Sequence, residues 1–102
     1  MKLLTKELLR TLPRLGTTEA QGEQALVVVK FFDPTGSWTW YATEFDPEAR
    51  QFFGLVDGFE VELGYFSLDD LETVRGRLGL GIERDLNWTP KPLAEVRRRI
   101  AR

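Results

Sequence analysis

Four short segments between residues 26 and 66 constrain the fold most, because each of them favours extended backbone. All four are rich in β-branched and aromatic side chains, the residue types that strands prefer. They are residues 26–32, 38–45, 51–56 and 59–66. Turn residues separate them, and Asp57-Gly58 can supply the positive φ angles of a two-residue hairpin. We therefore expect a four-stranded antiparallel meander.

The distribution of apolar side chains differs between the last segment and the first three. In the last segment the odd positions from Phe59 to Tyr65 are apolar, whereas Glu60 and Glu62 point the other way. One face of that strand should therefore meet water. The first three segments carry apolar bulk on both faces. Either helices cover both sides of that part of the sheet, or one side is an exposed aromatic platform.

Helix signals lie before and after the meander. Thr5 is placed to cap a first helix, and Pro13 should end it. Ser67 is placed to cap a second helix over about 68 to 75, which Gly76 should close. Two short helices are therefore expected to pack on the sheet.

The C-terminal part predicts one more strand and one more helix. Residues 82–88 alternate and are expected to pair, as a fifth strand, with the open edge of the first. After Pro92, a final helix would bury a stripe that includes Leu93 and Val96. The expected fold class is α+β, with an antiparallel four- to five-stranded meander sheet and N-terminal, middle and C-terminal short helices packed on it. Residues 1–102 should form a single domain.

Composition excludes several classes of chemistry. The absence of cysteine and histidine removes disulfides, thiol chemistry, the usual general base and the commonest metal ligand. No stretch approaches the roughly 20 apolar residues that span a bilayer. We expect a cytoplasmic protein with no cofactor, no metal site and no membrane partner. The sequence assigns no catalytic residue, so enzymatic activity is not the favoured interpretation.

Charge is distributed unevenly although the net charge is only -2. Residues 1–14 sum to +3, residues 15–74 to -10 and residues 75–102 to +5. Such asymmetry favours a partner chosen by electrostatics. The alternative is that the basic ends fold against the acidic middle and neutralise part of it.

Several motifs in a fixed order resemble a known family. The resemblance runs from Leu3 to about Leu93 and includes Val-Lys-Phe-Phe, Trp-Thr-Trp-Tyr-Ala-Thr-Glu-Phe-Asp, Glu-Leu-Gly-Tyr-Phe-Ser-Leu-Asp-Asp-Leu-Glu and Gly-Leu-Gly-Ile-Glu-Arg-Asp-Leu. The chain is similar to a family of small bacterial proteins catalogued as a domain of unknown function, family 2958. The resemblance implies a bacterial, intracellular setting, often on plasmids, phages and other mobile elements. It brings no established catalytic residue.

An aromatic group on the second strand is the first candidate site. It consists of Trp38, Trp40 and Tyr41. Aromatic side chains on a sheet face can stack on nucleobases. Core packing is the simpler interpretation, because large aromatic residues dominate the cores of small domains.

Arginines are the second candidate group, because guanidinium groups bind phosphate. Arg75 and Arg77 flank glycines that would let backbone amides approach an anion. Arg84 is expected on the same face as its apolar neighbours and therefore needs a carboxylate such as Glu44 or Asp46. A cluster on the final helix completes the set, with Arg97, Arg98 and Arg99.

Carboxylates form the third candidate group and would bind Mg²⁺ if they met. The set is Asp33, Glu44, Asp46, Glu83 and Asp85. Ordinary turn formation explains Asp33-Pro34 and Asp46-Pro47 equally well.

Three functional hypotheses follow from these groups. The leading one is a non-enzymatic binding module of a bacterial mobile element that acts through a protein partner, as a monomer or a homodimer. The alternative is a nucleic-acid-binding protein that uses the aromatic sheet face and the arginine cluster. The third is a metal-dependent nuclease.

Overall fold

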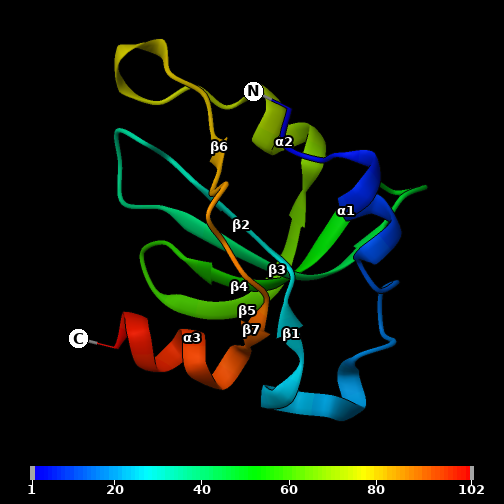
Figure 1. The fold of residues 1–102 in the computed structure, drawn as a ribbon. Coiled ribbons are helices and arrows are strands. Elements are labelled where there is room, and N and C mark those ends of the chain that lie inside the picture. Colours follow the sequence, from blue (N-terminus) through cyan, green and yellow to red (C-terminus); the bar gives the residue numbers. More distant parts are fainter. Residues whose placement is uncertain (1, 102) are drawn as a thin grey trace.

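The computed structural model describes residues 2–101 and has an α+β fold around a five-stranded antiparallel sheet (Figure 1). The strand order is β5-β4-β3-β2-β6. These strands are β2 (Val29–Phe32), β3 (Thr39–Asp46), β4 (Gln51–Asp57), β5 (Val61–Ser67) and β6 (Glu83–Arg84). A separate two-stranded sheet pairs β1 (Leu26–Val27) with β7 (Lys91–Pro92). The expected meander is confirmed, because β2, β3, β4 and β5 are neighbours in chain order.

Five short helices surround the sheets in the part of the chain that the structure describes. They are α1 (Lys6–Thr11), the 3-10 helix η1 (Glu19–Gln24), α2 (Leu68–Thr73), the 3-10 helix η2 (Arg77–Gly79) and α3 (Leu93–Ile100). Two caps that the sequence predicts are confirmed: the Thr5 hydroxyl accepts from the Leu8 N–H, and the Ser67 hydroxyl accepts from the Asp70 N–H, both at 3.1 Å. None of the helices within residues 2–101 combines the length and apolar content needed to cross a membrane.

The second helix is shorter than predicted. It ends at Thr73, and its C-cap Val74 is extended rather than left-handed, so Gly76 does not close the helix. The chain leaves the helix early because Arg75 and Gly81 form a bridge that closes the η2 loop. Gly76 instead allows a close approach, since an added Cβ would lie 2.7 Å from the Thr35 hydroxyl.

The expected first strand is interrupted at Val28. The Val28 N–H donates to the Ala42 carbonyl at 2.9 Å, while Val29 is also registered with Ala42. Two residues therefore face one, which is a β-bulge. The bulge divides the predicted strand into β1 and β2, which take part in different sheets.

Two other predictions about strands are wrong in detail. The hairpin between β4 and β5 has three loop residues rather than two, because Asp57 is registered with Val61. The predicted strand 82–88 pairs with β2 as expected but spans only β6. It ends there because the Asn87 N–H donates to the Asp85 carboxylate and the chain turns.

Helices cover both sides of the central strands, which confirms the first of the two alternatives. The α1–α2 face of the sheet packs against α1 and α2 and has a core that contains Phe31, Phe45 and Phe52. The opposite face, the α3 face, packs against α3 and has a core that contains Tyr41 and Leu55. Figure 1 shows α1 and α2 on one side of the sheet and α3 on the other.

The α3 face is not covered over β5. The helix α3 packs on β1 and η1, and its buried side chains Leu93 and Val96 contact the Tyr41 and Leu55 cluster. The side chains of β5 on this face therefore remain open to solvent, with Leu63 42% and Tyr65 63% exposed.

Candidate binding surfaces

The three predicted aromatic residues do not form one platform. Strand alternation places Tyr41 on the α3 face, where it is buried and its ring lies 5.8 Å from that of Trp88. Trp40 lies on the other face, packed against the core beneath α1 and α2. Trp38 and Trp40 are both half-buried.

The half-buried Trp38 and Trp40 join the exposed Phe59 in an aromatic cluster. The Trp38 ring centroid lies 6.0 Å from that of Trp40 and 5.2 Å from that of Phe59. Phe59 is 95% exposed at the tip of the β4–β5 hairpin. Gly58 permits this arrangement, because an added Cβ would lie 2.4 Å from the Trp38 ring. Sequence analysis did not single out Phe59, although an aromatic residue beside a glycine turn was a usable signal.

Two of the predicted arginines, Arg75 and Arg84, bind main-chain carbonyls. The Arg84 guanidinium donates to the Lys2 carbonyl at 2.7 Å and to the Leu3 carbonyl at 3.2 Å. Arg75 donates to the Glu72 carbonyl at 3.0 Å. Arg77 is exposed.

The expected pairing of Arg84 with Glu44 or Asp46 is not the arrangement that the structure shows. Glu44 is buried on the α3 face, whereas Arg84 is registered with Phe31 of the opposite core. The Asp46 carboxylate accepts from the Glu48 N–H in a turn. The prediction failed because a second irregularity, between Ala42 and Glu44 of β3, shifts the register of β3 with β4 and turns Glu44 to the α3 face.

The arginines of α3 lie on the opposite side of the sheet from Trp38 and Trp40. Arg97 forms an ion pair with Glu23 of η1 at 2.7 Å, and Arg99 forms one with Glu95 at 3.7 Å. Arg98 is exposed. The structure therefore separates the predicted cationic cluster from the aromatic cluster.

The carboxylates are dispersed as well. Asp33 accepts from the Thr35 N–H in a turn, and Asp85 forms an ion pair with Lys30 at 3.8 Å. Within residues 2–101, no group of three acidic side chains is placed to hold a metal ion.

Glu44 has a structural role that sequence analysis did not identify. It is 3% exposed, and its carboxylate accepts from the Gly16 N–H at 2.8 Å, from the Thr18 N–H at 2.8 Å and from the Thr18 hydroxyl. These bonds attach the segment before η1 to β3. The segment becomes one wall of a hollow on the α3 face.

That hollow has a volume of about 350 Å³ and lies beside β5. Its apolar wall includes Phe53, Leu63 and Tyr65, and the rings of Phe53 and Tyr65 are 5.0 Å apart. Residues of η1 line the facing wall. The hollow is therefore continuous with the uncovered side chains of β5.

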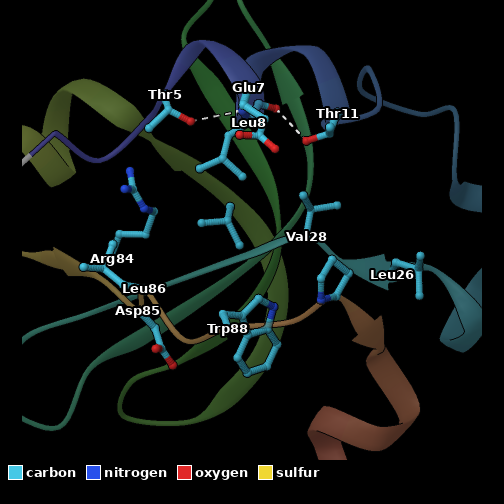
Figure 2. Close-up of a pocket in the computed structure, with 12 residues that line it drawn as sticks. Thr5, Glu7, Leu8, Thr11, Leu26, Val28, Arg84, Asp85, Leu86 and Trp88 are labelled. Carbon is cyan, nitrogen blue, oxygen red and sulfur yellow. Dashed lines mark hydrogen bonds between the residues drawn. The ribbon is translucent and has the colours of Figure 1, made fainter.

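A second hollow of about 550 Å³ lies between α1 and the segment after β6 (Figure 2). Leu8 approaches it from α1, and Leu86 and Trp88 approach it from the other side. Arg84 and Asp85 line it too, but both are engaged by the protein itself. Glu7 also lines the hollow and is exposed, so the lining carries both acidic and basic side chains.

Electrostatics differ between the two ends of β5. Near its C-terminal end Arg50 forms ion pairs with Asp69 at 2.7 Å and Glu72 at 2.8 Å. The hydrogen bond from Arg50 to Asp69, followed by the attraction of Asp69 and Glu72, raises the pKa of Arg50 above its usual value. Near the other end, Glu60 and Glu62 are exposed, and neither forms an ion pair with any residue in 2–101.

Comparison with known proteins gives a family but no function. No curated protein and no solved structure matches the chain. The model of one family matches residues 3–102, nearly the whole chain, and that family is described as "Protein of unknown function (DUF2958)". The resemblance that the sequence motifs suggested is thereby confirmed, and the chain belongs to the DUF2958 family.

Proposed function

We propose that the protein is a peptide-binding module that receives an extended segment of a protein partner as an added strand beside β5. The observation that supports this most is the state of β5. It is a seven-residue strand at the end of the sheet, and β4 is its single strand neighbour within residues 2–101. Proteins usually protect such an edge with charge, proline or a covering element. β5 carries one charged residue, Glu62, whereas its α3 face is apolar and uncovered. An uncovered apolar face beside an open strand edge is typical of an interaction site.

The backbone of β5 offers hydrogen-bonding groups to such a partner. The Leu68 N–H donates to the Arg50 main-chain carbonyl at 2.9 Å, and the Glu60 main-chain carbonyl accepts from the Gly58 N–H at 3.0 Å. Both even-numbered residues therefore point their main chain toward β4. Alternation along the strand directs the N–H and C=O groups of Val61, Leu63 and Tyr65 to the open side.

The hollow on the α3 face supplies specificity for an apolar side chain. Peptides that add a strand gain affinity from main-chain hydrogen bonds and specificity from pockets that take alternate side chains. The wall formed by Phe53, Leu63 and Tyr65 is suited to an aliphatic or aromatic anchor. The bonds of Glu44 to Gly16 and Thr18 keep the opposite wall in place.

These features support a protein partner more than they support nucleic-acid binding or metal-dependent nuclease activity. Glu60 and Glu62 lie near the aromatic cluster of Trp38, Trp40 and Phe59 and would repel phosphates. The α3 arginines lie on the other face, and the carboxylates are dispersed. The leading hypothesis from the sequence is therefore the one we retain.

Selection from a library of random seven-residue peptides displayed on phage tests the proposal. We expect enrichment of peptides with apolar residues at alternate positions. Leu63→Pro removes one outward N–H without removing a bond to β4, and should weaken binding by about tenfold. Leu63→Val keeps the N–H and an apolar side chain and is the matched control. Failure to enrich any peptide, or equal binding by both variants when both remain folded, would contradict the proposal.

A further inference from the structure

We infer that the α1–α2 face of the β5 edge selects cationic side chains, so that the partner segment alternates apolar residues with lysine or arginine. This inference rests on the proposed strand addition and identifies the chemistry of the partner. It comes from the acidic and aromatic side chains at the hairpin end of β5. They are Trp38, Trp40, Phe59, Glu60 and Glu62, here called the hairpin patch.

The register of the sheet places Glu62 on the same face as Trp40. Trp40 is registered with Val56, and Val56 is registered with Glu62. Residues that are directly opposite on paired strands point to the same face. Leu63 and Tyr65 point to the α3 face, so the two faces of β5 differ in chemistry.

An added strand would contact both faces of the β5 edge, because its successive side chains point alternately to one face and the other. A residue paired with Leu63 would project toward the apolar hollow. A residue paired with Glu62 would project to the other face, with its Cβ about 5 Å from that of Glu62. The chemistry expected on that side is a positive charge.

The charges around the hairpin patch point the same way. Residues 15–74 sum to -10, and Lys30 and Arg50 are the basic residues in that range. Lys30 pairs with Asp85, and Arg50 pairs with Asp69 and Glu72 at the other end of β5. Glu60 and Glu62 are thus left for a partner, and both are exposed.

The aromatic cluster adds a second attraction for cations. Phe59 is 95% exposed and Trp38 is half-buried beside it, with ring centroids 5.2 Å apart. A lysine or arginine at the end of the added strand near the hairpin would pass over these rings and reach Glu60. A cation within about 6 Å of an aromatic ring is attracted by its face.

Two capped synthetic peptides test the selection directly. Both have seven residues, one alternating valine with lysine and the other alternating valine with glutamate. Binding to the protein is measured by calorimetry and tryptophan fluorescence. At low salt we expect the valine–lysine peptide to bind at least about fivefold tighter than the valine–glutamate peptide, because two opposite-charge pairs form across the strands. The difference should shrink at about 0.5 M NaCl, since exposed charges are then screened.

A pair of variants separates local from general electrostatics. Glu60→Gln combined with Glu62→Gln should abolish the preference for the lysine peptide. Glu7→Gln combined with Glu48→Gln changes the net charge equally at distant exposed positions and should preserve it.

The outcomes distinguish this inference from the proposed function. Equal binding of the two peptides to the wild-type protein, with binding still weakened by Leu63→Pro, would overturn charge selection and leave strand addition standing. Loss of the preference in both double variants would attribute it to net charge and overturn the hairpin patch. If neither of the two peptides binds, both charge selection and strand addition are overturned.

Discussion

Replacing Glu44 by glutamine tests whether its buried carboxylate fixes the wall of the hollow beside β5. One carboxylate oxygen accepts from the Gly16 N–H, and the other accepts from the N–H and the hydroxyl of Thr18. An amide has a single acceptor oxygen. Its favoured orientation keeps that oxygen on Thr18 and turns the NH₂ group toward the Gly16 N–H. One charge-assisted bond is then lost, and the other two become neutral and weaker.

The expected cost is about 2 to 3 kcal/mol of unfolding free energy, because hydrogen bonds to charged groups contribute about 1.5 to 3 kcal/mol each. With a urea m-value of about 1.5 kcal/mol/M, the midpoint should fall by roughly 1.5 M. Urea unfolding followed by tryptophan fluorescence measures it, and Glu48→Gln, at an exposed turn, is the control. Glu44→Gln with a midpoint within about 0.3 M of wild type would refute the reasoning.

Three further changes test the packing of the sheet and its helices. Gly54→Ala should prevent folding, seen by circular dichroism, because the new Cβ would lie 1.9 Å from the Tyr41 carbonyl oxygen; Gly64→Ala, with no atom within 4 Å, should melt like the wild type. Phe52→Ala should lose about 3 to 5 kcal/mol in urea unfolding, and a loss below about 1 kcal/mol would contradict its central place in the core. Thr5→Ala should lose about 1 kcal/mol through its N-cap, whereas an unchanged melting temperature would count against the cap.

Sequence patterns predicted the parts of the fold that depend on local chemistry. The hydroxyls of Thr5 and Ser67 cap helices by accepting from the N–H group three residues later, so these caps depend on local sequence alone. Apolar alternation and turn residues likewise identified the meander strands. The bulge at Val28 was not predictable, because it depends on how β2 and Ala42 meet across the sheet.

The candidate site depended on long-range arrangement and was harder to predict. The sequence suggested that Trp38 and Trp40 lie together but also included Tyr41, which a one-residue step sends to the opposite face. The sequence showed that apolar and acidic side chains alternate along β5. It did not show whether α3 would cover the apolar face of that strand. Since α3 packs on β1 and η1, Leu63 and Tyr65 are left exposed.

Amide hydrogen exchange along β5, with and without the selected peptide, tests the proposed strand addition most directly. The amides of Leu63 and Tyr65 point to the open side and should exchange quickly in the free protein. On saturation with peptide, their exchange should slow by at least about tenfold, because they gain hydrogen-bond partners. The amides of Gly64 and Phe66, which already face β4, should change little. Slowed exchange around the hollow between α1 and the segment after β6, with exchange in β5 unchanged, would contradict the account.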